Sequence, residues 1–196
     1  MINDSFLCGD ISSDIVPDID EVHSRLQVSG DFSLDSVAKC REELVKALDI
    51  KYVGAKVRVF YPDKDITDIG FGPIKSSLMY NKLKNCNEAI VFAVTLGHGV
   101  DRLLNKLSVT SVYEHYVVDA LASAYAEKAC DVVQNIIKGD FTCYKRFSPG
   151  YGDIPLEIQP KVLQLLDAGK YINVVIGKNL LMSPTKSITA IMGIKS

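Results

Sequence analysis

The stretch from Tyr144 to Pro155 concentrates the residue types that could do chemistry in this chain. It reads Tyr-Lys-Arg-Phe-Ser-Pro-Gly-Tyr-Gly-Asp-Ile-Pro, and its two prolines and two glycines restrict the backbone at some positions and free it at others. Arg146 supplies a charged fork that can grip a carboxylate or a phosphate, and Tyr151 supplies a ring that can stack on a flat ligand. The pattern indicates either a ligand-binding loop or a surface turn whose tyrosine packs onto its own domain. Composition alone favours the turn.

Other candidate residues lie outside this stretch. Asp119 and Glu127 are eight residues apart on a long predicted helix, and at about 3.6 residues per turn they lie close to one face. They could point into a cleft and bind a ligand there. Two carboxylates at the edge of the buried apolar stripe are the simpler explanation of this spacing. Gly97 and Gly99 flank His98 after a buried strand. Their spacing is not that of a phosphate-binding motif, so a flexible turn explains them better.

The histidines and cysteines indicate no metal or redox centre. The three histidines are far apart in the sequence, and the five cysteines form no Cys-x-x-Cys pair. An odd number of cysteines argues against a disulfide framework. We interpret all five as structural or incidental and expect no metal site.

Helices and strands must position these residues. The run 88–95 is almost continuously apolar, as in a strand buried on both faces. The longest predicted helix, 110–138, has an apolar stripe and a middle rich in small residues, and Gly139 ends it. Residues 1–30 are weakly patterned. Further helices are predicted over 35–48 (capped by Ser33 or Asp35), 73–83 (opened by Pro73), 100–107 and 156–168, and further strands over 52–61, 66–71, 141–145, 172–181 and 188–194.

Composition limits the class of protein. With 196 residues, 47% of them hydrophobic, the chain is large enough for one domain with a real core. The net charge is −2 and no cluster of five or more Lys and Arg residues occurs, so binding to nucleic acid or to an anionic membrane has no electrostatic support. The apolar stretch 89–96 is far too short to span a membrane, and the N-terminus lacks a signal-peptide layout. We expect a cytoplasmic protein.

Three motifs in order resemble the activation (reactivation) domain of vitamin B12-dependent methionine synthase. Val118-Asp-Ala-Leu-Ala-Ser-Ala-Tyr-Ala-Glu127 is similar to the long helix of that family. Arg146-Phe-Ser-Pro-Gly-Tyr-Gly152 is similar to its Arg-Pro-Ala-Pro-Gly-Tyr-Pro loop between a strand and a helix. The stretch 176–191 is similar to its Leu-Thr-Glu strand followed by Pro-x-x-Ser-Val-Ser-Gly. The likeness is best over 88–194, whereas the N-terminal helical region 1–50 matches poorly.

The resemblance implies an α+β fold, a twisted antiparallel sheet with helices, as a single domain over 1–196. It implies a free-standing subunit that docks on a corrinoid (cobalamin) protein or a truncated methionine synthase. There it would support reductive remethylation with S-adenosylmethionine (SAM) and a flavodoxin-type electron donor. Because the chain has no corrinoid, zinc or folate motif, it would not be active alone. The implied SAM-binding residues are Arg146, Ser148, Asp119 and Ser123, and the implied cobalamin-facing residues are Tyr151, Pro149 and Gly150.

Two alternatives stay open at this point. A helix glutamate that the family uses for SAM falls on Ser123 here, so the chain could be a non-catalytic docking or capping module for a corrinoid protein, without SAM binding. An unrelated small-molecule enzyme on the same scaffold is the weaker alternative, because no nucleophile–base pair supports it.

The loop and the long helix together predict a cleft. Residues 146–155 should form one wall and the small-residue face of helix 110–138 the other, with Arg146 facing Asp119 or Ser123. In the absence of a ligand, the Arg146 guanidinium should pair with a nearby carboxylate. Asp119 is the first candidate because Ser123 is uncharged. Losing the Arg146 contact would weaken a bound carboxylate by about 1.5–3 kcal/mol. A Tyr151 buried in the core would contradict this hypothesis.

Overall fold

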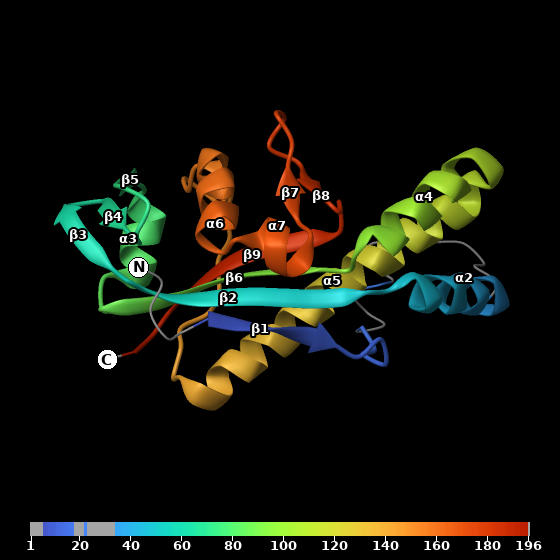
Figure 1. Ribbon diagram of the computed structural model, residues 1–196, viewed down its shortest axis with the longest axis horizontal. Helices are drawn as coiled ribbons and strands as arrows, with labels where there is room; N and C mark the ends of the chain where they lie inside the picture. Colours follow the sequence, from blue (N-terminus) through green and yellow to red (C-terminus); the bar gives the residue numbers. More distant parts are fainter. Residues whose placement is uncertain (1–5, 18–21, 23–33, 196) are drawn as a thin grey trace.

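The computed structural model describes residues 6–17, 22 and 34–195 (Figure 1). Among these residues the main sheet has four antiparallel strands in the order β1-β2-β6-β9. The strands are β1 (Phe6–Ile11), β2 (Ile50–Arg58), β6 (Glu88–Thr95) and β9 (Ser187–Gly193). The predicted α+β class with an antiparallel sheet is confirmed, and the strand predicted over 88–95 has these bounds.

Both faces of the sheet are buried, and β6 shows how. Side chains alternate between the faces of a strand, so Phe92 enters one core and its neighbour Val91 enters the other. Both side chains are fully buried. The continuous apolar run of β6 is therefore a consequence of having helices on both sides.

The first core lies between the sheet and three helices. These are α2 (Leu34–Ala47), α4 (His98–Thr110) and α5 (Val112–Asp140), and α5 runs obliquely across the sheet (Figure 1). The small residues of α5, such as Ala122 and Ala124, are fully buried in this core. They bring the helix close to its neighbours, so the prediction that they leave one wall of a cleft open is wrong.

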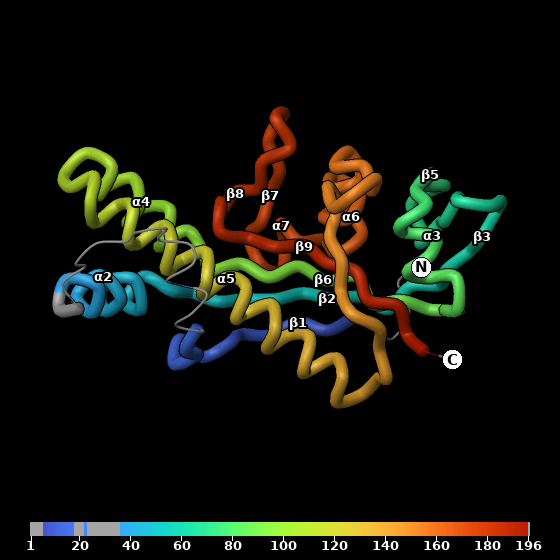
Figure 2. Tube along the Cα trace, turned by 180° about the vertical axis from the view of Figure 1, so that it is seen from behind, coloured from blue at the N-terminus to red at the C-terminus, as the bar shows by residue number. Residues whose placement is uncertain are grey.

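The second core lies on the opposite face. It is covered by α3 (Ser77–Leu83), the 3₁₀ turn η1 (Leu156–Ile158), α6 (Gln159–Leu165) and α7 (Ala168–Ile172). Figure 2 shows α3 and α6 rising from this face, with the connection from α5 to α6 passing beside β9. That connection contains the Arg146 loop.

Two small sheets extend from this body. One contains β3 (Phe60–Asp63), β4 (Ile66–Asp68) and β5 (Ile74–Lys75). The other is the hairpin of β7 (Val175–Ile176) and β8 (Met182–Ser183), which projects from the body in Figure 1.

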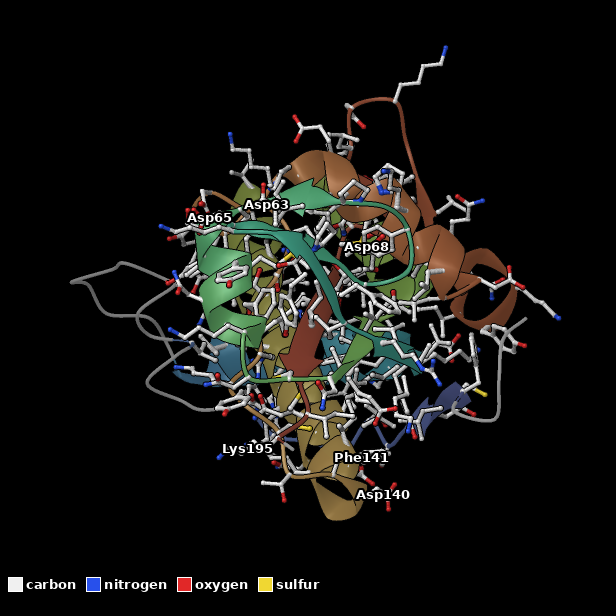
Figure 3. The ribbon with its side chains drawn as sticks, turned by 90° about the vertical axis from the view of Figure 1, so that its left-hand side faces the viewer. Asp63, Asp65, Asp68, Asp140, Phe141 and Lys195 are labelled. Atoms are coloured by element: carbon white, nitrogen blue, oxygen red, sulfur yellow. The ribbon has the colours of Figure 1, made fainter. Side chains whose placement is uncertain are left out.

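Figure 3 shows Asp63, Asp65 and Asp68 at the β3–β4 end of the molecule. The Asp68 carboxylate accepts hydrogen bonds from Gly70 N (2.8 Å) and Gly72 N (3.1 Å), so it serves a turn. Within the described residues no group of three or more His, Cys, Asp and Glu side chains could hold a metal ion. No helix in that part of the chain is long and apolar enough to cross a membrane.

Several predicted strands differ from the structure. The strand predicted over 52–61 ends at Arg58, and Pro62 lies in β3, which belongs to the smaller sheet. The strand predicted over 66–71 ends at Asp68. The stretch 172–181 contains only the two strand residues of β7, because Ile172 ends a helix. The stretch 141–145 forms only an isolated bridge, between Cys143 and Ile194 just after β9, and is not a strand. The weakly patterned N-terminal stretch contains β1.

Some predicted helices also differ. Gly139, which was predicted to end the longest helix, lies within α5, which ends at Asp140. The helix predicted to open at Pro73 begins at Ser77, because β5 intervenes and the Ser76 side chain caps it by accepting from Met79 N. The helix predicted over 156–168 is split into η1 and α6, and Ala168 opens α7. The predicted cap at Ser33 lies outside the described residues, as do the side chain of Asp35 and most of 1–30.

Candidate functional site

The segment that leaves α5 is held along the free edge of β9. Phe147 N donates to Ile191 O at 3.0 Å, and Ile191 N donates back to Phe147 O at 2.8 Å. Tyr144 N donates to Gly193 O at 2.9 Å. The side chain of Phe147 is buried in the second core. The position of Arg146, one residue before Phe147, is therefore set by the sheet.

The chain then folds into a compact turn over 148–154. Gly150 N donates to Ile154 O at 3.0 Å, and Ile154 N donates to Tyr151 O at 3.1 Å. Gly150 and Gly152 have φ of 82° and 61°, a region that residues with a side chain rarely adopt. The turn buries Ile154 and leaves Tyr151 61% exposed. The binding-loop hypothesis requires that Tyr151 lie outside the core, and it does.

Asp153 fastens this turn to the start of α3. Its carboxylate accepts from Ser76 Oγ at 2.6 Å, from Ser77 N at 2.8 Å and from Leu78 N at 3.1 Å. The Ser76 hydroxyl, with these backbone N–H groups, holds the pKa of Asp153 below its ordinary value. The carboxylate also satisfies backbone donors at the first turn of the helix. The loop is therefore fixed at both ends.

The Arg146 guanidinium is bound by three acceptors on one face of α5. Nη2 donates to Glu127 Oε2 at 3.0 Å, and Nη1 donates to Asp131 Oδ1 at 2.5 Å and to Gln134 Oε1 at 3.3 Å. The Arg146 side chain is 20% exposed, whereas Glu127 and Asp131 are 40% and 50% exposed. The prediction that Arg146 faces Asp119 or Ser123 is wrong, because the loop meets α5 further toward its C-terminal end.

Cys130 lies beside this cluster and is buried. Burial is the main cause that raises the pKa of its thiol to about 12, so it is neutral. Burial by itself lowers the pKa of Arg146, but the hydrogen bonds to Asp131 and Glu127 and the charge of Asp131 raise it above its ordinary value. The fork is therefore permanently charged.

A hollow of about 820 Å³ opens beside Arg146, as the loop hypothesis expects. Arg146, Ser148 and Tyr151 all line it. Two of the residues predicted to bind SAM and one predicted to face cobalamin therefore come together. The full lining is Lys82, Asp131, Gln134, Lys138, Lys145, Arg146, Phe147, Ser148 and Tyr151.

A second hollow of about 340 Å³ lies along the other side of the loop. Pro149 lines it together with Leu156 and with Leu181 and Met182 of the β7–β8 hairpin, and Ser148 borders both hollows. Gly150 is exposed in the turn between them. Of the residues predicted to face cobalamin, Tyr151 therefore lines the charged hollow, Pro149 lines the apolar one and Gly150 lines neither.

Asp119 and Ser123 belong to a separate cluster with Lys186. Lys186 Nζ lies 2.8 Å from Asp119 Oδ1 and donates to Ser123 Oγ at 2.8 Å. Ser123 Oγ itself donates to Asp119 O at 2.9 Å. The Lys186 side chain is only 15% exposed. The two residues thus fix the turn before β9 and do not reach Arg146.

One ridge of α5 supports both clusters. Asp119, Ser123, Glu127 and Asp131 recur every four residues, a spacing that places side chains in a row along a helix. The shared face predicted for Asp119 and Glu127 is therefore seen, but each carboxylate has its own cation. Asp131, Gln134 and Lys186 were not among the predicted site residues. The spacing of Glu127, Asp131 and Gln134 was a usable signal, whereas nothing local pointed to Lys186.

Comparisons with known proteins fit the fold. No protein-family model matches the sequence, and no curated protein matches it either. Among solved structures, the chain is similar to one described as the crystal structure of the MetH reactivation domain bound to AdoHcy. The TM-score is 0.70 and the identity 13%, over 96% of this chain and 78% of that chain. The fold is therefore that of the MetH reactivation domain, as the sequence resemblance implied. At this identity the likeness concerns the fold alone.

Proposed function

We propose that this chain is a stand-alone, reactivation-domain-like subunit that docks on a corrinoid-binding protein and supports SAM-dependent reductive remethylation in a methionine synthase-type system. One observation carries the proposal: a fastened loop holds the Arg146 fork in a hollow with the exposed Tyr151 beside it. The shared fold with the MetH reactivation domain supports it, and the AdoHcy bound to that domain suggests a ligand of the SAM type.

In this proposal Arg146 anchors the carboxylate of SAM. A guanidinium can hold a carboxylate through two parallel hydrogen bonds. The ligand carboxylate must replace Asp131, which is the more exposed of the two carboxylates and can return to water. Glu127 then keeps Nη2 and holds the fork in place. Ser148, at the border of the two hollows, is a further polar contact for the ligand.

Tyr151, Pro149 and Gly150 form the part of the loop that would meet the partner's corrinoid. When bound to its own protein and reduced by a flavodoxin-type donor, the cobalamin supplies the cobalt centre that accepts the methyl group. The role of this chain would be to hold the methyl donor next to its acceptor. The transfer then no longer depends on a bimolecular encounter. Asp119 and Ser123, engaged by Lys186, act by fixing the turn before β9 and not by touching SAM.

Calorimetric titration of SAM and AdoHcy tests the ligand part. We expect saturable binding that Arg146→Ala weakens by about 10- to 100-fold, as for loss of a hydrogen bond between charged groups. Arg102→Ala is the matched control, because Arg102 is exposed on α4 and lines neither hollow beside the loop. Binding that is undetectable at millimolar SAM, with and without a corrinoid protein, would refute this part.

The second candidate is a non-catalytic docking or capping module for a corrinoid protein. It is favoured by the internal pairing of the basic residues, since Arg146 is already bound by three acceptors and Lys186 by Asp119 and Ser123. A pull-down with the corrinoid-binding module of a methionine synthase separates the two. The docking module retains the partner without SAM and loses it in Tyr151→Ala, whereas retention in both Tyr151→Ala and Arg146→Ala would exclude the loop as the docking surface.

A further inference from the structure

The hollow beside Arg146 carries more positive charge than its carboxylates neutralise. Arg146 is matched by Asp131 and Glu127. The lining also contains Lys82, Lys138 and Lys145. Among the described residues none of these three lysines forms an ion pair. This surplus stands out in a chain whose net charge is −2.

The lysines come from three separate elements. Lys82 is in the last turn of α3, Lys138 in the last turn of α5, and Lys145 precedes Arg146 in the loop. Lys82 Nζ lies 6.0 Å from the centre of the Phe147 ring, which lines the same hollow. Their convergence is thus a result of the tertiary structure and not of a basic run in the sequence.

The charge of the hollow differs from what SAM requires. SAM has one carboxylate but also an ammonium and a sulfonium group, so its net charge is positive. The unpaired lysines repel both of these positive groups. A phosphate group suits the hollow better, because lysine ammonium groups act as point charges for phosphate and the arginine fork binds two of its oxygens. The lysines are therefore not explained by the carboxylate of SAM.

The hollow also provides an aromatic surface. Tyr151 is 61% exposed, and a ring of this kind stacks on a planar ligand. The volume of about 820 Å³ exceeds the needs of a free phosphate and falls within the roughly 300–1,000 Å³ of small-molecule pockets. A ring and a phosphate on one ligand would use both features.

We propose that the Arg146 hollow binds a phosphate-bearing molecule with a planar ring, of the nucleotide class. The phosphates lie among Arg146, Lys82 and Lys145, and the ring lies on Tyr151. The inference takes from the proposed function only that this loop is a binding site, and it needs neither SAM nor a corrinoid partner.

Calorimetry with ADP, pyrophosphate and adenosine at low salt tests the ligand class. We expect ADP to bind most tightly, pyrophosphate less tightly and adenosine not detectably up to about 5 mM, with ADP binding weakened as salt rises. Lys82→Gln/Lys145→Gln should weaken ADP binding about tenfold or more, because two charge-assisted contacts are lost. Lys106→Gln/Lys178→Gln removes the same charge from exposed positions outside the hollow and should change the affinity less than about twofold.

Amide chemical shifts provide a second readout that does not depend on a variant. ADP should shift the amides of Tyr151 and Gln134, which both line the hollow. Absence of ADP binding, equal weakening by both double variants, or shifts confined to other surfaces would overturn the inference. Lys82→Gln/Lys145→Gln leaves Arg146 in place and removes two charges that repel SAM. It should therefore bind SAM at least as tightly and retain the corrinoid module in the assays above, so failure of the nucleotide inference and failure of the proposed function are separate results.

Discussion

Replacing Asp131 with asparagine should lower stability and raise ligand affinity at the same time. Asp131 Oδ1 accepts from Arg146 Nη1 at 2.5 Å, and it is the carboxylate that a ligand must replace. Asparagine keeps the size of the side chain and its oxygen acceptor but removes the charge. The guanidinium stays charged, so the hydrogen bond itself remains and what is lost is the attraction between the two charges.

The structure sets the size of this effect. Asp131 is 50% exposed, so solvent screening limits the lost charge–charge attraction to about 0.5–1 kcal/mol. For a chain of this length we expect a melting temperature about 1–4 °C lower. The same free energy no longer opposes the ligand carboxylate, so SAM should bind about 2- to 5-fold more tightly.

Thermal unfolding and calorimetric titration on the same samples measure both quantities. Asp140→Asn is the matched control, because Asp140 is an exposed carboxylate at the last residue of the same helix, and Figure 3 shows it at the end of α5. A variant of Asp131 that loses stability without gaining affinity for SAM would refute the exchange of carboxylates at Arg146. An equal gain in Asp140→Asn would assign the effect to net charge.

Three further predictions concern the framework around the site. Gly99→Ala should lower the free energy of unfolding by about 1–3 kcal/mol, because the new Cβ would lie 2.2 Å from Ala47 O, whereas Gly139→Ala, with nothing within 4 Å, should not lower it. Hydrogen exchange of the amides that donate to Asp153 should depend on pH. Their protection should be complete above 3.8, the pKa of Asp153 in the unfolded chain, and should decrease as pH falls through the lower pKa of the folded state. Asp153→Asn should abolish this pH dependence. Alkylation at pH 8 followed by mass spectrometry should modify the exposed Cys8 first and spare the buried Cys130, whose pKa is about 12; early labelling of Cys130 would contradict this.

The largest elements were predictable because their patterns are long. The strand 88–95 is apolar throughout since both of its faces are buried, and the stripe of α5 repeats over 29 residues. The strands of the small sheets have two to four residues, too few for a periodicity to be recognised. The start of α3 was misplaced because proline is common at a first helical turn, but here Ser76 provides the cap.

The site could be predicted in part. Arg146 and Tyr151 were identified from residue type and a stiffened loop, and both face a hollow. The partners of Arg146 could not be chosen, because they depend on where the loop pairs with the edge of β9, and bonds such as that between Phe147 and Ile191 join residues distant in sequence. Lys186 was missed for the same reason, since Asp119 lies 67 residues before it.

The ridge of α5 bears on how the proposed ligand could act on the docking surface. Two cations from later segments, Arg146 and Lys186, are held by carboxylates of this one helix. On the proposal above, a ligand that replaces Asp131 removes one of the two ion pairs that fasten Arg146 to α5. Phe147 and Asp153 still hold the turn between them to β9 and α3, so the backbone that carries Tyr151 stays in place. A ligand would therefore act on Tyr151 by direct contact, because its side chain lines the same hollow as Arg146, and not by freeing the loop.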